Sequence, residues 1–512
     1  MTKNEADLNT KDRLTKTVIV LAVGEVLRGL IALISQVIIA KEFGTSNILD
    51  AFLISLTIPN LIGDFFIGGI IYLSFIPVFT DFKLKNDQKS SNRFIKTLFV
   101  LQFYLLAIVT ILYWLLIPAL IPILAPGFTV DIKNIAFNMF YMVSPLLLVF
   151  GLSLFGRAIY HSYKNFKIPI ISSLAYPVFI ILSVSILGRR MGAYSLAVGA
   201  VLGGVAQLII ISGYYFNKNI AGIKRFNFDH PDIIKVVKIS FPLLISGIIT
   251  QVNLIIIRMV ATTIIEGGVA VLNYASQVIS ITFQPMVAII GTAVFPSLSE
   301  ESSKDNFVAI KQIFLRSFKI IMFLSIPMTI GIIILRQQIV ELIFQRGSFD
   351  AVSTVLTGEA LFYLSLGIFA MGGNVILGRL FYSLKLMTTV LKVGVVSISL
   401  SVATIFILKD TMGINALALA FSIKDISYFV MLVFILNKIF DVFKDRKLHI
   451  SILKVIAATV VMGCVIWAVK PFVNVILNVI IGTVAFLCSA LLLKAEELQE
   501  AKLLLKKYYS KG

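Results

Sequence analysis

Apolar runs of about 20 residues recur from one end of the chain to the other, separated by short polar stretches. Each run is long enough to cross roughly 30 Å of hydrocarbon as a helix. The runs are continuous rather than alternating, which excludes a transmembrane barrel. We therefore expect an all-α integral membrane protein. The pattern predicts fourteen spans, at approximately 16–40, 50–79, 94–118, 132–157, 168–187, 193–216, 233–262, 268–296, 307–334, 352–378, 387–408, 413–437, 450–469 and 472–493.

The charges in the connecting segments predict how these spans are oriented. With the N-terminus inside, Lys and Arg in the inner segments outnumber those in the outer loops by about four to one, which is a clear positive-inside bias. Both termini are therefore expected in the cytoplasm, and the protein in the plasma (inner) membrane. The tail at 494–512 is predicted to form a basic amphipathic helix on the inner surface, where it meets anionic lipid.

Two stretches in the two halves of the chain resemble each other weakly. Pro77 precedes an acidic exit in FIPVFTDF, and Pro296 does the same in VFPSLSEE. Repeats of this kind are a transporter signature, with the substrate held between the halves. The predicted organisation is a cytoplasmic lead at 1–15, an N-lobe of six spans at 16–216, a C-lobe of six spans at 233–437, two further spans at 450–493, and the tail at 494–512.

The composition agrees with a membrane protein and removes other classes. Hydrophobic residues make up 58% of the 512 residues and charged residues 14%, far more apolar surface than a soluble core needs. The net charge of +19 is explained by basic inner loops, so no nucleic-acid partner is expected. Cys464 and Cys488 lie inside apolar runs, and neither a disulfide framework nor metal-ligand spacing is present. The first run is too long for a signal-peptide core, so it is interpreted as a retained span.

Ionisable side chains in the first two spans are candidate functional residues, because a charge at bilayer depth is costly unless it faces a cavity or a partner. Glu25 and Arg28 stand three residues apart and can pair on one helix face. Asp50 lies at the outer mouth of the second span, where it is either a cavity residue or the N-cap of its helix. Asp64 lies near the middle of that span and has no obvious local partner.

Further ionisable groups lie in the second half of the chain. Arg258 lies late in the seventh span and Lys392 in the eleventh. Lys424 and Asp425 are adjacent in the twelfth span. Each is either a structural ion pair between helices or a group that lines a cavity, and the sequence leaves both possibilities open.

Prolines inside the spans predict bent helices that line a cavity or flex during transport. The positions that matter most are Pro59, Pro145 and Pro285. No metal-ligand spacing, phosphate-binding glycine loop or Ser/His/Asp grouping is present. The loops are also too short and too basic for a membrane glycosyltransferase. The sequence therefore predicts a transporter that is not an enzyme and needs no cofactor.

Several segments resemble the MurJ (MviN) family of lipid II flippases, which belongs to a superfamily of multidrug and oligosaccharidyl-lipid exporters. They occur in the family's order and spacing over the first twelve spans. They are FG…DAF…PNL at 43–61, LAPGF at 124–128, SP…NFKIP at 144–169, AVGAVLGGVAQL at 197–208, NYAS…GTAVFPSLS at 273–299, IFQRGSFD at 343–350, GRLFYSLK at 378–385 and GINALALAFSI at 413–423. The resemblance implies two six-helix lobes around a cationic cavity, with the last two helices forming a groove for a lipid tail.

The chain departs from the family pattern where the cavity arginines are expected. Just beyond Pro-Asn-Leu, Gly63 and Asp64 stand where the family has two arginines, and Gln277 replaces another arginine. Arg28 is retained near one expected position, and Asp50 matches the family's cavity aspartate. A diphosphate is best held by guanidinium groups, so these changes weaken the expected site.

The resemblance implies a flippase that moves a polyprenyl-diphosphate-linked saccharide, such as lipid II, to the outer leaflet by alternating access. Arg28 and Arg258 would hold phosphate, and Asp50 and Asp64 would contact sugar hydroxyls or a coupling cation. A monovalent cation or the membrane potential would drive transport. The expected partners are the lipid-linked substrate and membrane lipids, with the protein a monomer. The alternatives are an exporter of polysaccharide repeats or cationic drugs, and a membrane scaffold that does not transport.

Overall fold

The computed structural model describes residues 24–65, 88–163, 165–217, 251–441 and 444–498. Helices dominate these ranges, which contain no strand. The chain divides into two compact units, Met1–Ala270 and Val271–Gly512, and each is described by itself. The N-lobe and C-lobe bounds expected from the sequence remain a prediction.

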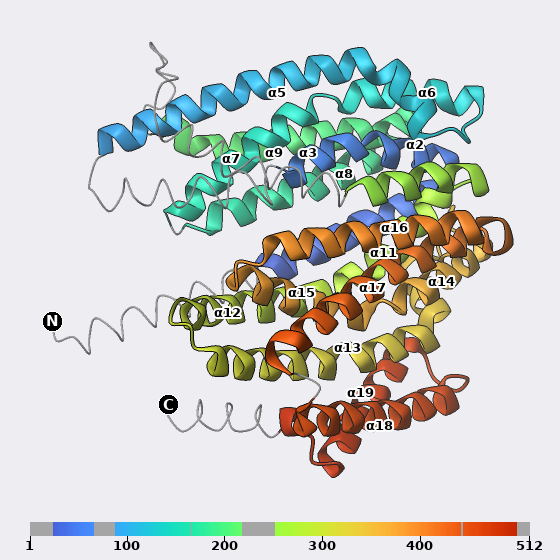
Figure 1. The fold of residues 1–512 in the computed structure, drawn as a ribbon. Helices are drawn as coiled ribbons and strands as arrows, with labels where there is room; N and C mark the ends of the chain where they lie inside the picture. Colours follow the sequence, from blue (N-terminus) through green and yellow to red (C-terminus); the bar gives the residue numbers. More distant parts are fainter. Residues whose placement is uncertain (1–23, 66–87, 164, 218–250, 442–443, 499–512) are drawn as a thin grey trace. The chain divides into compact units, whose positions relative to one another are not determined.

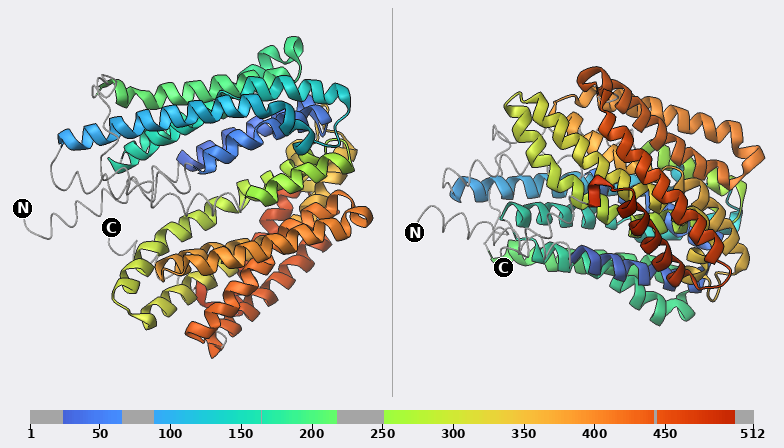
Figure 2. Two further views of the ribbon diagram at one scale, coloured as in Figure 1. Left: turned by 45° about the horizontal axis from the view of Figure 1, so that its top comes forward. Right: turned by 90° about the horizontal axis from the view of Figure 1, so that it is seen from below.

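The first unit is built from long apolar helices that run roughly alongside one another (Figures 1 and 2). Helix α7 packs against α5, α3 and α9, while α8 pairs with α9 and α2 with α6. Buried Phe94, Phe155 and Ile211 belong to the core between α5, α7 and α9. The elements are a helix over 24–43, α2 (Asn47–Ser55), α3 (Thr57–Phe65), α5 (Gln88–Leu124), α6 (Val130–Val143), α7 (Leu146–Ser162), α8 (Lys167–Met191), α9 (Tyr194–Asn217) and a helix over Gln251–Ile264.

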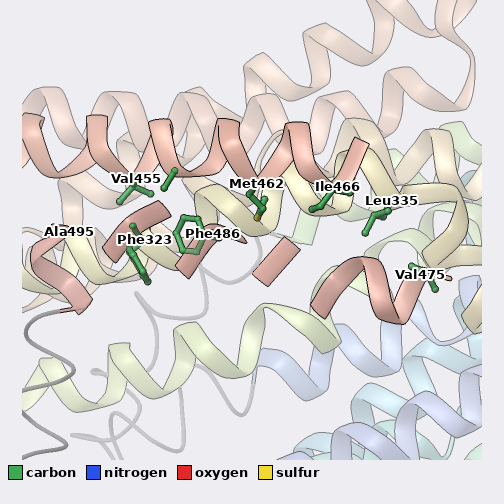
Figure 3. Packing of buried hydrophobic residues seen from close by; sticks show 10 residues of the cluster. Phe323, Leu335, Val455, Met462, Ile466, Val475, Phe486 and Ala495 are labelled. Atoms are coloured by element: carbon green, nitrogen blue, oxygen red, sulfur yellow. The ribbon is translucent and has the colours of Figure 1, made fainter. Parts of the chain in front are cut away.

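The second unit is organised around its longest helix, α13, which contacts α12, α14, α15, α18 and α19. Apolar side chains of α13 interlock with those of α18 and α19, among them Phe323, Met462 and Phe486 (Figure 3). The elements are α11 (Gly268–Thr282), α12 (Gln284–Ser303), α13 (Phe307–Phe344), α14 (Ala351–Ser365), α15 (Ile368–Ser383), α16 (Met387–Met412), α17 (Ile414–Phe440), α18 (Arg446–Val469) and α19 (Val475–Leu492).

The start of the C-terminal tail is fastened to this helical core. Ala495 is buried in the cluster of α13, α18 and α19. Glu496 forms an ion pair with Lys319 of α13, with Nζ and Oε2 2.8 Å apart, and Glu497 accepts a hydrogen bond from Ser451 of α18. Residues 496–498 are helical, and the rest of the predicted amphipathic tail lies outside the described residues.

The apolar helices are those of a multi-pass membrane protein. Within the described residues, nine helices are long and apolar enough to cross a bilayer, or ten if α14 and α15, which meet at 44°, form one broken span. Shorter apolar helices over 47–61 and 251–264 overlap predicted spans that also include residues that are not described. The apolar helix over 268–282 overlaps a predicted span whose remaining part lies in α12. Each of the fourteen predicted spans coincides with at least one helix in the described part of the chain.

Three of the predicted bend positions lie at or near breaks between helices. Pro145 separates α6 from α7. Its ring nitrogen has no hydrogen to donate to the Tyr141 carbonyl, and the Ser144 hydroxyl donates to that oxygen instead, at 2.8 Å. Pro59 lies in the first turn of α3 and Pro285 in the first turn of α12, where a missing N–H is tolerated.

Candidate functional site

Asp50 is the most completely buried of the candidate acidic side chains whose surroundings are described. It lies in the first turn of α2, and its exposed fraction is 0%. Oδ2 accepts a hydrogen bond from the N–H of Val269 at 3.1 Å, and Oδ1 accepts one from Ala270 at 2.7 Å. Both amides belong to the first turn of α11, where N–H groups have no partner within the helix and attract negative charge. Asp50 therefore caps a helix more than 200 residues away in the chain.

This arrangement corrects one of the two interpretations of Asp50. The N-cap of α2 is Ser46, whose hydroxyl accepts a hydrogen bond from the N–H of Leu49. Asp50 lies four residues further on, inside the helix, and its carboxylate is directed to α11. The prediction that Asp50 caps its own helix is therefore wrong.

Arg258 fastens the helix over 251–264 to the break between α2 and α3. Its Nη1 donates to the carbonyl oxygen of Leu53 at 3.0 Å and to the hydroxyl of Thr57 at 2.6 Å. Arg258 also lies close enough to Asp50 to interact with it electrostatically. The guanidinium has five N–H donors, and these two bonds use only part of them.

Two glycines allow the backbone around these residues to approach very closely. A Cβ at Gly127 would lie 1.9 Å from the carbonyl oxygen of Thr262, and one at Gly267 would lie 2.2 Å from that of Thr45. Gly267 also has φ of +70°, which favours glycine, and its N–H donates to Asn47. We call Asn47, Asp50, Arg258 and the residues that they bond the junction cluster. Both side-chain and backbone atoms take part in the hydrogen bonds of this cluster.

Glu25 and Arg28 form the ion pair that their spacing predicts. Arg28 Nη2 lies 2.7 Å from Glu25 Oε2, and both side chains are about half exposed (48% and 53%). An exposed i,i+3 pair contributes little to stability. Its two charges therefore remain accessible to a ligand.

Two further candidate positions lie in α3 and α11. Asp64 lies in α3, and its side chain is outside what the structure describes. Gln277 is half-buried in α11 and belongs to the second unit. Site roles for Arg28, Asp64 and Gln277 remain predictions.

Ionisable groups in the second unit form two ion pairs within apolar helices. Lys424 Nζ lies 3.3 Å from Asp425 Oδ1 in α17. Arg336 Nη2 of α13 lies 3.1 Å from Glu359 Oε1 of α14. Sequence reasoning anticipated the first pair from adjacency and missed the second, because 23 residues separate its members. Lys392, in α16, is exposed.

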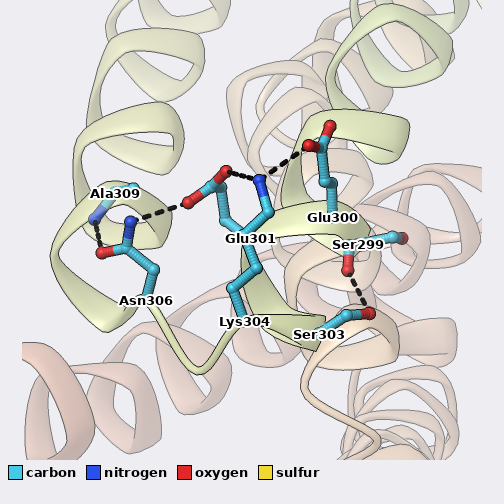
Figure 4. Close-up of polar contacts among 7 residues, drawn as sticks. All are labelled: Ser299, Glu300, Glu301, Ser303, Lys304, Asn306 and Ala309. Atoms are coloured by element: carbon cyan, nitrogen blue, oxygen red, sulfur yellow. Dashed lines mark hydrogen bonds and ion pairs between the residues drawn. The ribbon is translucent and has the colours of Figure 1, made fainter.

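A separate polar cluster closes the turn between α12 and α13 (Figure 4). Lys304 Nζ lies 2.7 Å from Glu300 Oε1 and 3.0 Å from Glu301 Oε1, and Asn306 donates to Glu301 at 2.7 Å. The hydrogen bond from Lys304, followed by that from Asn306, lowers the pKa of Glu301 below its ordinary value. No group of three or more His, Cys, Asp or Glu side chains in the described ranges is placed to hold a metal ion.

Comparisons with known proteins identify relatives over nearly the whole chain. The model of the family described as "Lipid II flippase MurJ" matches residues 39–485. The "Probable lipid II flippase MurJ" of Rickettsia prowazekii is 27% identical over 459 residues, which cover 88% of each chain. That of Thermotoga maritima is 25% identical over 494 residues, covering 95% of this chain and 98% of the relative.

Solved structures share the fold. "Lipid II flippase MurJ, inward closed conformation" matches with a TM-score of 0.80 at 20% identity, over 92% of this chain and 98% of that one. An inward-facing multidrug resistance MATE family transporter of the MOP superfamily matches with a TM-score of 0.69 at 15% identity, over 84% and 99% of the two chains. At these identities, the likeness concerns the fold alone.

Proposed function

Because the chain belongs to the lipid II flippase MurJ family, we propose that it moves lipid II, a polyprenyl-diphosphate-linked saccharide, from the inner to the outer leaflet by alternating access. The observation that carries this proposal is the family match over residues 39–485. The multi-pass helical architecture is what such transport requires. No covalent step is involved, so the proposed protein is a transporter and not an enzyme.

The proposed setting is the plasma (inner) membrane, with both termini in the cytoplasm. The basic inner loops support this orientation. The proposed partners are the lipid-linked substrate and membrane lipids, with the protein acting as a monomer and without nucleic acid. No cofactor is required, and a monovalent cation or the membrane potential supplies the driving force.

The proposed binding roles are given to the two guanidinium groups. Arg28 is about half exposed, and Arg258 has N–H donors beyond the two that it uses in the junction cluster. Guanidinium groups suit a diphosphate because they donate two hydrogen bonds in one plane. Both carboxylate oxygens of Asp50 accept backbone hydrogen bonds, so Asp50 would position its surroundings. Asp64 would contact sugar hydroxyls or a coupling cation.

A second candidate function is export of a different substrate, such as a polysaccharide repeat or a cationic drug. Gly63, Asp64 and Gln277 stand where the family resemblance leads us to expect arginines. The fold is shared with a multidrug transporter. A less cationic cavity would bind a diphosphate more weakly and a cation more strongly.

Complementation in a bacterium depleted of its own lipid II flippase tests the proposal. The wild-type chain, an Asp64→Arg variant and an Asp410→Arg control are each expressed at matched levels. Asp410→Arg makes the same charge change at an exposed position of α16. Survival with the wild type and the control supports lipid II transport.

Two other results would count against lipid II as the substrate. Rescue by Asp64→Arg alone would mean that the cavity serves a different substrate and that one restored arginine returns it to lipid II. Loss of rescue in all three strains, with the protein present in the membrane, would overturn the proposal.

A further inference from the structure

Two apolar segments are interrupted at matching places in the two halves of the chain. Residues 144–145 separate α6 from α7, and residues 366–367, which lie 222 positions later, separate α14 from α15. The surrounding sequences also correspond, with YMVSPLLLVFG at 141–151 and YLSLGIFAMGG at 363–373. Related halves are common in transporters. We therefore treat the two breaks as counterparts and compare how each is held.

In both breaks, the backbone carbonyl oxygen of the first tyrosine accepts a hydrogen bond from a serine hydroxyl. The Tyr141 oxygen accepts from Ser144, three residues later, at 2.8 Å. The Tyr363 oxygen accepts from Ser422 of α17 at 2.6 Å, and the same hydroxyl lies 3.1 Å from the Leu364 oxygen. In a continuous helix, such an oxygen accepts from the N–H four residues later. A serine therefore replaces the helical bond in each half, and in the second half it comes from a neighbouring helix.

The residue four positions after each tyrosine decides whether the break can close. In the first half this residue is Pro145, which has no N–H, so the helical bond cannot form. In the second half it is Gly367, whose N–H donates to the Leu364 oxygen at 3.2 Å, three residues back. Transfer of this N–H from Leu364 to Tyr363 would restore the ordinary helical bond. The first break is therefore permanent, whereas the second is reversible.

Helix α17 holds the second break in its bent form. Ser422 is buried, and a Cβ on Gly367 would lie 2.9 Å from its Oγ and 3.0 Å from its Cα, so glycine allows this close approach. On the α15 side of the break, Asn374 donates to the backbone carbonyl of Asp425 at 3.0 Å and fastens α15 to α17. The stretch 363–373 contains no proline. The 44° angle between α14 and α15 therefore depends on contacts with α17.

We propose that the break between α14 and α15 is a reversible hinge, which the Ser422 hydroxyl holds in its bent form. When this hydroxyl withdraws, the Gly367 N–H returns to the Tyr363 oxygen, and the Leu364 oxygen becomes free to accept the Ile368 N–H. The two helices then join into one straight span. The change exchanges hydrogen bonds of similar strength, so the bent and straight forms can lie close in free energy.

The hinge itself goes beyond the proposed function and does not depend on the identity of the substrate. Its use in transport rests on the proposed function, because alternating access requires segments that change shape. Hinges of this kind are a few residues at the ends of helices that absorb a change in backbone angles. Since Pro145 makes the break in the first half permanent, the structure assigns this change of shape to the second unit.

A distance measurement by pulsed electron paramagnetic resonance, on the full-length protein in lipid nanodiscs, tests the hinge. Spin labels are placed at Val352 and Lys385, exposed residues near the far ends of α14 and α15, after Cys464 and Cys488 are replaced by serine. The two helices contain 15 and 16 residues and meet at 44°. At a rise of 1.5 Å per residue, straightening lengthens the distance between their ends by about 3 Å.

We expect the wild type to show the shorter distance and Ser422→Ala to add a population that is about 3 Å longer. Ser427→Ala is the matched control, because it removes a hydroxyl of α17 that donates within its own helix, to the Lys424 carbonyl oxygen at 3.1 Å. This control should keep the wild-type distance. An unchanged distance in Ser422→Ala would overturn the hinge.

A second variant distinguishes straightening from a general loosening of the helices. Leu366 has φ of −57°, which proline adopts, and proline removes the N–H that a continuous helix would bond to Phe362. Leu366→Pro should therefore keep the break bent and return Ser422→Ala to the shorter distance. If the longer distance persists in the double variant, it does not arise from a joined helix, and the hinge is overturned.

Complementation separates this inference from the proposed function. Leu366→Pro alone should reach the membrane and keep the shorter distance, but it should not rescue the strain depleted of its own flippase, because its hinge cannot straighten. Rescue equal to that of the wild type would overturn the part of the hinge in transport and leave lipid II transport supported. Failure of the wild type to rescue would overturn lipid II transport, while the distances would still decide whether the hinge exists.

Discussion

The carboxylates of Asp50 and Asp425 both lie on apolar helices, and they differ in the partners that surround them. Asp50 is fully buried, and both of its oxygens accept backbone N–H donors. Asp425 is one-fifth exposed, and its carboxylate contacts a flexible ammonium group. Backbone amides at a helix start stabilise a fixed negative charge. A lysine partner permits the charge to change. Asp50 therefore joins two helices of distant sequence, whereas Asp425 pairs with a neighbour on its own helix.

The two carboxylates also differ in how far along the chain their partners lie. The junction cluster joins segments whose sequence separations exceed 200 residues, so its bonds fix the course of the chain. The Lys424–Asp425 pair joins neighbours on one helix and constrains nothing distant. Substitutions in the junction cluster should therefore reduce stability, whereas substitutions in the pair should change stability little.

The largest effect is expected from Gly127→Ala, which forces apart the close backbone contact between Gly127 and Thr262, near the junction cluster. The added Cβ would lie 1.9 Å from the Thr262 carbonyl oxygen, and backbone atoms on both sides must move. Overpacking of this kind costs about 3 kcal/mol. Thermal unfolding in detergent measures it, with Gly188→Ala as the control, because a Cβ there meets nothing within 4 Å. Equal stability of the two variants would mean that the close approach is not needed.

Asp50→Asn is expected to have the next largest effect. The amide keeps the shape but loses the charge, and one of its two polar atoms is a donor facing an N–H group. Loss of charge-assisted hydrogen bonds costs about 2 kcal/mol. Asp425→Asn is the matched control and should cost less than about 1 kcal/mol, because its ion pair is partly exposed. A greater loss of stability at Asp425 than at Asp50 would mean that the hydrogen bonds of Asp50 are not the more important for stability.

The two regions also mark how far sequence reasoning reaches. Helices, spans and the Glu25–Arg28 pair follow from periodicity and from spacing of three residues, because helix geometry fixes those neighbours. The partners of Asp50 are backbone amides 219 and 220 residues away, and no pattern of side chains predicts them. The N-cap interpretation of Asp50 failed because Ser46, four residues earlier, already supplied the capping hydroxyl.

Thr57→Val should have a smaller effect and shows how much one side chain contributes to the junction cluster. The change removes the hydroxyl that accepts from Arg258 and keeps the volume of the side chain. Arg258 retains the Leu53 carbonyl, so we expect a loss of about 1.5 kcal/mol in unfolding free energy. Thr404→Val, which removes an exposed hydroxyl bonded to its own helix, is the control. If both variants lose the same amount, the Arg258 bond does not stabilise the cluster.

The smallest effect is expected at the turn between α12 and α13, where the charged side chains of Lys304 and Glu300 are exposed to water. Hydrogen bonds from Lys304 and Asn306 hold the pKa of Glu301 below its ordinary value of 4.5. The folded state therefore binds the Glu301 proton more weakly than the unfolded state. This contribution to stability is present above about pH 4.5 and is lost as the pH falls through the lower folded pKa. Lys304→Gln removes the main donor, so its melting temperature should lie slightly below that of the wild type at pH 6 and approach it below pH 4. High salt should shrink the difference at pH 6. A difference that grows on acidification would show that Lys304 acts on a different group, because loss of the Glu301 charge can only weaken this pair.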